Sequence, residues 1–248
     1  MPIPATVALR AFLMLATYSG THRHVSRAVK SVRAWWSGKK IAVIGPVAGG
    51  KDSFLARLRG RDIPKAHAGS PVGEQVEAFK VKLALSHGQE IDMTCKGVIN
   101  TGGEAAFRDD PAGWRAVCED ADVIFYVMTI DDLARKRFYR GRRVRQDLEW
   151  LFTVLPHLRP DVLVHILINK IDLEIESHTD YTALAVELVK EIAALDRAVR
   201  QILHPYDARY TGATLISMRN KQIYTRAIQE ALRSIYAALD ATHARQAA

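Results

Sequence analysis

The segment GPVAGGKDS, at residues 45–53, is the sequence feature that most constrains the fold. It directly follows the apolar run 39–45 and precedes a helical pattern that ends near Gly60. The order strand, glycine loop, helix lets backbone N–H groups and a helix N-terminus surround an anion, and the lysine of G-x-x-x-x-G-K reaches the terminal phosphates. We therefore predict a phosphate-binding loop. Its candidate binding residues are Gly45, Val47, Ala48, Gly49, Gly50, Lys51, Asp52 and Ser53.

Apolar runs of strand length alternate with helical patterns from residue 39 onward, which predicts an α/β fold with a mostly parallel sheet between two helical layers. Six strands are expected, at 39–45, 75–85, 91–100, 121–130, 161–170 and 213–218. The second and third are predicted to form an antiparallel hairpin. Helices are expected near 52–60, 147–158, 179–203 and 222–241, whereas 101–120 is expected to be a loop. Residues 39–248 are predicted to be one domain.

The net charge of +8 arises in the first 51 residues, which contain eight Lys or Arg and no Asp or Glu. Val25, Val29, Val32 and Trp36 are spaced as on one face of a helix, so residues 1–38 are predicted to be a basic amphipathic extension. Its residues 7–36 are expected to contact an anionic membrane surface or to pack on protein. The apolar stretch 7–18 is too short to span a bilayer, so a cytoplasmic location is expected, with peripheral membrane contact at most.

The segment NKID, at residues 169–172, ends a predicted buried strand and therefore lies at the ligand side of a parallel sheet. The Asp172 carboxylate can accept two hydrogen bonds from the ring N–H and exocyclic amine of guanine. Asn169 can join the loops, and the aliphatic stem of Lys170 can lie on the base. Backbone N–H groups at Ser217 and Met218, which end the next predicted strand, would bond the guanine oxygen.

GPVAGGKDS, NTGGE at 100–104, NKID and the segment ISM at 216–218 together resemble small GTPases of the Ras superfamily, which have the P-loop NTPase fold. The resemblance covers residues 39–241 and is closest to the Arf-like branch and the beta subunit of the signal-recognition-particle receptor. It implies bound GTP or GDP, with Gly103 among the nucleotide contacts. It also implies two switch segments that respond to the third phosphate and contact a protein partner.

The sequence departs from this family where the family binds magnesium and positions water. Asp52 replaces the Ser or Thr that ligates Mg²⁺, Asn100 replaces an aspartate, and Glu104 replaces the glutamine that positions the attacking water. The first switch, expected within 61–73, has no threonine, and Ser70 is its only candidate metal-facing hydroxyl. Glu104 is thus the candidate catalytic residue and Asp52 the candidate metal ligand.

The charge of Asp52 leaves two alternatives open. A carboxylate about 5 Å from a phosphate oxygen would cost about 3 kcal/mol at an effective dielectric of about 20. A divalent cation between them would reverse that sign, because carboxylates are good Mg²⁺ ligands. Asp52 therefore either ligates Mg²⁺ directly or empties the metal site and weakens hydrolysis.

A basic segment at 134–146 holds seven Lys or Arg between Arg135 and Arg145. It is interpreted as a docking patch for an acidic protein partner or a membrane, as the source of an arginine directed at the phosphates, or as a solvated surface. A nucleic-acid partner is not expected.

The leading functional hypothesis is a guanine-nucleotide-binding protein with weak or altered GTP hydrolysis, acting as a switch or as a nucleotide-stabilised subunit of a complex. One alternative is an active GTP hydrolase with Asp52 as a metal ligand. The other is a pseudo-GTPase that binds no nucleotide and serves as an interaction module.

Overall fold

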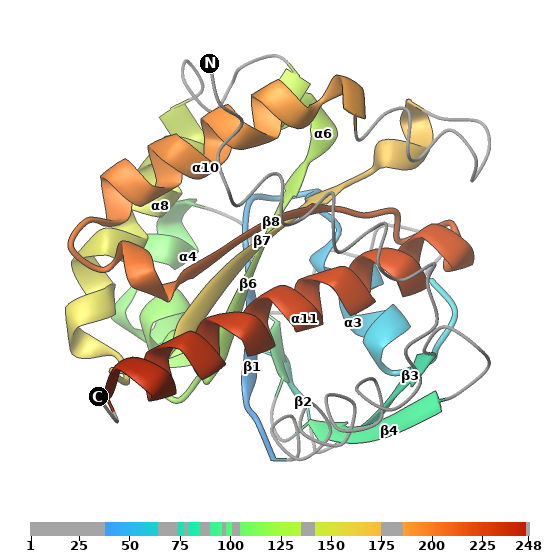
Figure 1. The fold of residues 1–248 in the computed structure, drawn as a ribbon, viewed down its shortest axis with the longest axis horizontal. Helices are drawn as coiled ribbons and strands as arrows, with labels where there is room; N and C mark the ends of the chain where they lie inside the picture. Colours follow the sequence, from blue (N-terminus) through green and yellow to red (C-terminus); the bar gives the residue numbers. More distant parts are fainter. Residues whose placement is uncertain are drawn as a thin grey trace.

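The computed structural model of this chain describes residues 38–63, 74–76, 79–84, 90–95, 98–100, 105–134, 142–174 and 186–246. These residues form an α/β fold in which helices pack on a central β-sheet (Figure 1). Residues 1–37, which carry the predicted N-terminal extension and the expected membrane contact at 7–36, lie outside this set.

Four adjacent strands of the sheet run parallel to one another. They are β1 (Ile41–Ile44), β6 (Val123–Thr129), β7 (Leu163–Asn169) and β8 (Tyr210–Leu215). Near their C-terminal ends Ile44 pairs with Tyr126, and Thr129 pairs with Asn169. Because parallel strands end at one edge of a sheet, the loops after β1, β7 and β8 emerge at the same edge. The predicted α/β class with a parallel sheet is confirmed.

The predicted hairpin is confirmed in its pairing, but its strands lie in two sheets. The predicted strand at 75–85 corresponds to β2 (Glu74–Val76) and β3 (Phe79–Ala84), and the one at 91–100 corresponds to β4 (Glu90–Cys95) and β5 (Val98–Asn100). Glu74 pairs with Asn100 and Phe79 pairs with Cys95, so both antiparallel pairs keep one register. β5 also pairs in parallel with β1, which gives the larger sheet the order β2-β5-β1-β6-β7-β8, while β3 and β4 form a separate ribbon.

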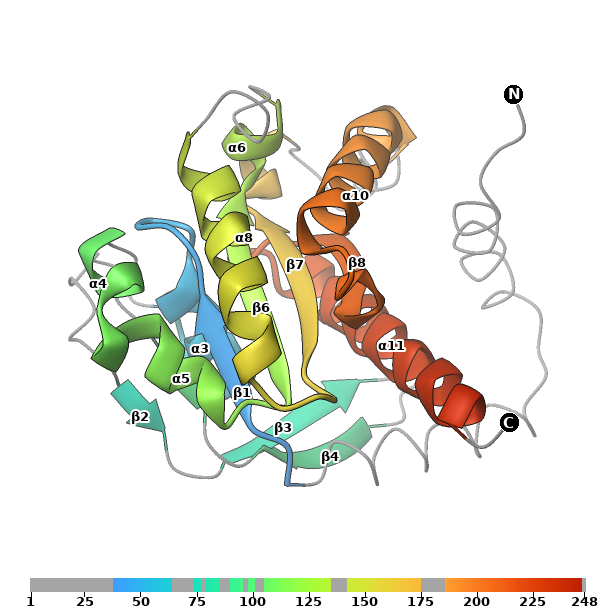
Figure 2. The same ribbon diagram turned by 90° about the vertical axis from the view of Figure 1, so that its left-hand side faces the viewer.

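Helices cover both faces of the sheet (Figures 1 and 2). One face carries α5 (Ala116–Glu119), α8 (Arg142–Val154) and α10 (Val189–Leu203), and the other carries α3 (Lys51–Leu58) and α11 (Lys221–Gln246). Successive side chains of β1 point to opposite faces of the sheet and so contribute to two hydrophobic cores. Ala42 and Ile44 pack in the first core, on the α8 face, and Ile41 and Val43 pack in the second core, on the α11 face.

The prediction of a loop at 101–120 is wrong for the described part of that range. It contains α4 (Ala105–Asp109), a segment with a kink at Gly113 (Pro111–Arg115) and α5. These elements are too short to show a helical repeat, and their stability comes from packing. Trp114 is fully buried and meets Trp150 of α8 edge to face, with ring centroids 5.4 Å apart.

Other predicted boundaries shift by a few residues. β8 begins at Tyr210 and ends at Leu215, so ISM follows the strand instead of ending it. Helix α10 begins at Val189, and the residues 179–185 that were expected to start it lie outside the described residues. Helix α11 is longer than predicted and runs from Lys221 to Gln246. A short helix, α6 (Ile130–Ala134), follows β6.

A buried carboxylate fastens α4 to the rest of this layer. Asp147 of α8 is fully buried and accepts hydrogen bonds from the Tyr126 hydroxyl at 2.9 Å and from Nη1 of Arg108 at 3.0 Å. Nε of Arg143 lies 2.9 Å from the same carboxylate, and the Arg143 guanidinium also lies over the Trp114 ring. Burial raises the pKa of Asp147 despite these partners. The network therefore depends on all of its members being paired.

We expect Asp147→Ala to lower the free energy of unfolding by about 3–5 kcal/mol, because it leaves two arginines and a buried hydroxyl without their acceptor. The matched control is Glu149→Ala on the same helix, which removes an exposed pair with Arg145 and should change stability by only about 0.5 kcal/mol. Urea unfolding of both variants measures the difference. Equal effects of the two substitutions would contradict the assigned role of the network.

Candidate functional site

The glycine loop curls tightly between β1 and the first turn of α3. Positive φ angles occur at Gly45 (139°), Ala48 (60°) and Gly50 (100°). The Gly49 N–H donates to the Pro46 carbonyl at 3.3 Å. Gly50 caps α3, which begins at Lys51, so the first N–H groups of the helix lie directly after the loop. This is the local geometry that the sequence predicts for an anion-binding loop.

The loop also rests closely on the ends of β6 and β7. A Cβ atom at Gly45 would overlap the Val127 carbonyl, and one at Gly49 would lie 2.6 Å from the same oxygen. A Cβ atom at Gly50 would overlap the Asn169 amide nitrogen. These three positions therefore require glycine for close packing, and two of them also for a positive φ.

Lys51 is buried beneath the loop, with 6% of its surface exposed. Its ammonium donates to the carbonyl oxygens of Gly45 at 3.1 Å and Pro46 at 3.0 Å. Burial lowers its pKa from 10.5 to about 8, Asp52 opposes this shift, and Arg143 adds to it. An anion beside this ammonium would raise the pKa again, so the group is suited to receive negative charge.

Asn169 joins the glycine loop to the loop after β8. Its side chain is almost wholly buried; Nδ2 donates to the Gly49 carbonyl at 2.9 Å, and Oδ1 accepts from the Met218 N–H at 3.2 Å. The expectation that Asn169 joins the loops is thus confirmed, whereas the Met218 N–H, which was predicted to bond the guanine oxygen, donates to Asn169 instead. Segments more than a hundred residues apart in the sequence meet at one amide.

Asp172 and Ser217 form the polar centre at the other end of these loops. The Ser217 hydroxyl is fully buried and donates to Oδ1 of Asp172 at 2.6 Å. The Asn220 N–H donates to the same hydroxyl at 3.0 Å, while the Asn220 side chain accepts from N–H groups in the first turn of α11. Lys170, which directly follows Asn169, has a positive φ of 67°. The Asp172 carboxylate is therefore held on one side and only partly buried.

The candidate metal ligand Asp52 lies in the first turn of α3, next to Lys51, and is partly buried, as is Ser53. Within the described residues, no group of three or more His, Cys, Asp or Glu is arranged to hold a metal ion. A single carboxylate is compatible with Mg²⁺, which takes most of its ligands from phosphate oxygens and water at nucleotide sites. Asp52 is the residue that would hold such an ion here.

Several predicted site residues fall outside the described part of the chain. They are Gly103, the candidate catalytic Glu104, Ser70 of the expected first switch, and residues 135–141 of the basic segment. Within that segment, Arg143 forms an ion pair with Asp147 and lies over the Trp114 ring, and Arg145 forms an ion pair with Glu149.

Of two arginines near the site, Arg57 was not identified from the sequence, whereas Arg143 belongs to the basic segment 134–146. Arg57, in the last turn of α3, donates to the Met218 and Arg219 carbonyls. Arg143 lies near enough to lower the pKa of Lys51. No sequence signal singles out Arg57, because an arginine at the end of an amphipathic helix is usually solvated.

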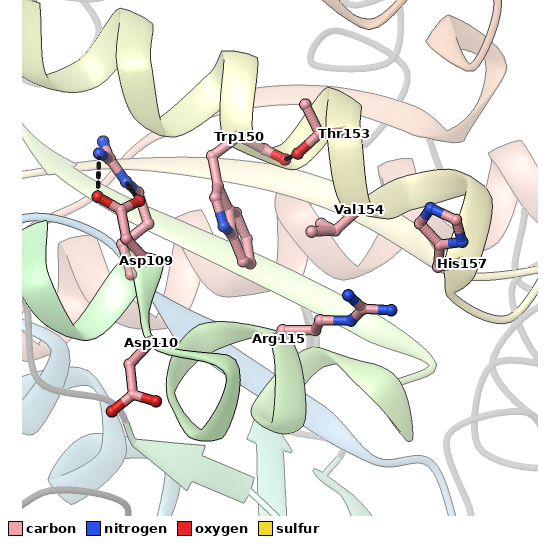
Figure 3. A pocket seen from close by; sticks show the side chains of 8 residues that line it. Asp109, Asp110, Arg115, Trp150, Thr153, Val154 and His157 are labelled. Atoms are coloured by element: carbon pink, nitrogen blue, oxygen red, sulfur yellow. Dashed lines mark hydrogen bonds and ion pairs between the residues drawn. The ribbon is translucent and has the colours of Figure 1, made fainter.

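A separate hollow of about 340 Å³ lies between α4 to α5 on one side and α8 on the other (Figure 3). Its lining is Arg108, Asp109, Asp110, Arg115, Trp150, Thr153, Val154 and His157. Arg108 is paired with Asp109, and their hydrogen bond lowers the pKa of Asp109. Acidic and basic groups balance in this lining, and it contains none of the predicted site residues. The hollow therefore does not define the function.

Comparison with known proteins adds no assignment: neither a protein-family model nor a curated protein sequence matches this chain. Among the described residues, no helix is both long enough and apolar enough to cross a membrane. Evidence for a function therefore comes from the glycine loop, the loops after β7 and β8, and the contacts among them.

We expect Lys51→Met to raise the free energy of unfolding at pH 7, because it removes a buried ammonium. The folded-state pKa of about 8 lies below the ordinary 10.5, so the unfolded chain binds this proton more tightly. The destabilising contribution of Lys51 is complete below pH 8 and is relieved as the pH rises toward 10.5. The gain of the variant should therefore shrink by up to about 1.4 kcal/mol per pH unit in that window.

Urea unfolding of both proteins at pH 7, 8 and 9 measures this change. Lys190→Met, at an exposed position on α10, is the control and should differ from the wild type by the same amount at every pH. A Lys51→Met difference that does not vary with pH would contradict the lowered pKa.

Proposed function

We propose that this chain is a guanine-nucleotide-binding protein related to the small GTPases of the Ras superfamily, in or near the Arf-like and signal-recognition-particle receptor beta branch. It binds GDP or GTP, hydrolyses GTP weakly or by an altered route, and acts as a switch or as a nucleotide-stabilised subunit of a complex. Two alternatives, an active hydrolase and a nucleotide-free module, are separated from it by the experiments below.

The observation that carries the proposal is the bridge made by Asn169. Its amide contacts Gly49 of the predicted phosphate loop and Met218 of the predicted base loop at the same time. A nucleotide needs a phosphate site and a base site on one edge of the sheet at a fixed separation. The bridge supports this because it sets the position of one loop against the other.

At the base end, the proposal assigns guanine recognition to Asp172. The Ser217 hydroxyl bonds one oxygen of this carboxylate, and the residue remains partly exposed. A carboxylate held in this way can accept from two adjacent N–H donors, which guanine presents and adenine does not. The stem of Lys170, the residue after Asn169, would cover a face of the base.

At the phosphate end, the proposal assigns charge neutralisation to Lys51 and the first N–H groups of α3. Two loop carbonyls now accept hydrogen bonds from the Lys51 ammonium, which can turn from them to a phosphate. Phosphate would raise the lowered pKa of this lysine, so binding favours its protonated form. The affinity for GDP should consequently fall as the pH rises above about 8.

The two alternatives each have one supporting observation. The position of Asp52 beside Lys51, at the start of α3, favours a hydrolase in which Asp52 ligates Mg²⁺. The hydrogen bonds from Lys51 to Gly45 and Pro46 favour a nucleotide-free module, because the loop satisfies its own lysine.

Isothermal titration of the full chain with GDP and with GTP, each with and without Mg²⁺, separates the three hypotheses. Micromolar or tighter binding that is insensitive to Mg²⁺ supports the leading proposal. Strong dependence on Mg²⁺ together with phosphate release supports the hydrolase. Absence of binding supports the nucleotide-free module and overturns the leading proposal.

We expect Asp172→Asn to weaken GDP binding by about 10- to 100-fold, since hydrogen bonds to a charged group contribute about 1.5–3 kcal/mol. The same variant should bind xanthosine diphosphate more tightly than the wild type does, because the asparagine amide can donate to the extra carbonyl oxygen of xanthine. Glu174→Gln is the control, since Glu174 is an exposed carboxylate two residues away. Unchanged GDP affinity in Asp172→Asn would show that the base site is assigned wrongly.

We expect Asp52→Ser to strengthen Mg²⁺-dependent binding of GTP, because it removes a negative charge near the phosphates and supplies a hydroxyl ligand. Titration of GTP at several Mg²⁺ concentrations measures the effect. Asp62→Ser, at an exposed position beyond the end of α3, controls for the loss of one charge. A weaker Mg²⁺ dependence in Asp52→Ser would favour direct coordination by Asp52.

A further inference from the structure

Arg57 forms a second connection between the two ends of the proposed site. It lies in the last turn of α3, and its side chain extends to the loop that follows β8. Nε donates to the Met218 carbonyl at 2.8 Å and Nη2 donates to the Arg219 carbonyl at 3.0 Å. Two N–H donors of one planar guanidinium thus hold two successive carbonyls, which fixes the orientation of the peptide unit between them.

The loop held by Arg57 is the loop to which base recognition is assigned. Its other hydrogen bonds come from different directions: Asn169 accepts from the Met218 N–H, and Ser217 links Asp172 to Asn220. Arg57 supplies the contact from the side of α3. The Met218 carbonyl and the Arg219 N–H belong to one peptide and point in opposite directions, so holding this carbonyl also directs the Arg219 N–H.

Helix α3 sets the distance over which this connection acts. Lys51 opens the helix and Arg57 lies six residues later, so the two are about 9 Å apart along the axis at 1.5 Å per residue. The helix is anchored by Phe54, Leu55 and Leu58, which are buried in the second core. A rigid spacer therefore separates the lysine at the phosphate end from the arginine at the base end.

We propose that Arg57 is a specificity-determining positioning residue, which holds the Ser217–Arg219 loop so that the Arg219 N–H contacts the carbonyl oxygen of guanine. This inference rests on the proposed function. It predicts that Arg57 acts on the base end alone, although it belongs to the helix that begins at the phosphate loop.

The test compares three ligands by isothermal titration of the full chain: GDP, inorganic pyrophosphate, and 2-aminopurine riboside diphosphate, which lacks the guanine oxygen and the adjacent ring N–H. In Arg57→Gln the dissociation constant of GDP should rise about tenfold. The constants of pyrophosphate and of the 2-aminopurine nucleotide should stay within about twofold of the wild type. The preference for GDP over the 2-aminopurine nucleotide is thus the quantity that falls.

The matched control is Arg61→Gln, which removes the same charge from an exposed position just beyond α3 and should leave all three constants unchanged. A second variant, Arg57→Lys, keeps the charge but not the planar pair of donors, and should lose part of the preference. It also provides the measurement if Arg57→Gln melts at a lower temperature than the wild type.

Each other outcome overturns the inference. An equal loss for all three ligands would assign Arg57 a general structural role and leave the proposed function standing. Unchanged GDP affinity in both Arg57 variants would remove the role of Arg57, again without affecting the proposed function. If the wild type binds neither GDP nor the 2-aminopurine nucleotide, the proposed function and this inference fail together.

Discussion

The primary amide of Asn169 is the interaction on which the candidate site depends. It is buried at the end of β7, where one group donates to the glycine loop and accepts from the loop after β8. Only an amide offers a donor and an acceptor side by side in a side chain this short. Its close contact with Gly50 adds a steric requirement, because a side chain at Gly50 would displace the amide. Removing either partner would leave a buried polar group unpaired.

The glycine loop itself supplies hydrogen-bond acceptors for the Lys51 ammonium. With its ammonium on the Gly45 and Pro46 carbonyls, the loop is internally satisfied, yet burial still keeps the pKa of the lysine near 8. A ligand anion would have to compete with two neutral carbonyls, which are weaker acceptors than phosphate oxygens. Under the proposed function, this internal order of the loop would reduce the entropy lost on nucleotide binding.

The parts of this structure that sequence predicts are those with a local pattern. The strand, glycine loop and helix at 39–58 follow from residue spacing, and the partnership of Asn169 with the glycine loop follows from the order of strands in a parallel sheet. The helical turns at 105–119 carry no period, and tertiary packing of Trp114 places them. Burial of Asp147 could not be predicted, because its partners Tyr126 and Arg108 are distant in sequence. The carbonyls that hold Arg57 belong to the backbone and leave no trace in the residue pattern.

Asn220 connects the C-terminal helix to the base loop by hydrogen bonds. One residue both bonds the Ser217 hydroxyl through its N–H and caps the first turn of α11 through its side chain. Helix α11 continues without a break for 26 residues, about 39 Å at 1.5 Å per residue. A tag, an antibody or a protein bound at the C-terminal end of this helix would transmit force along the helix to Asn220, which is linked through Ser217 to Asp172. Fusions there should therefore carry a flexible linker.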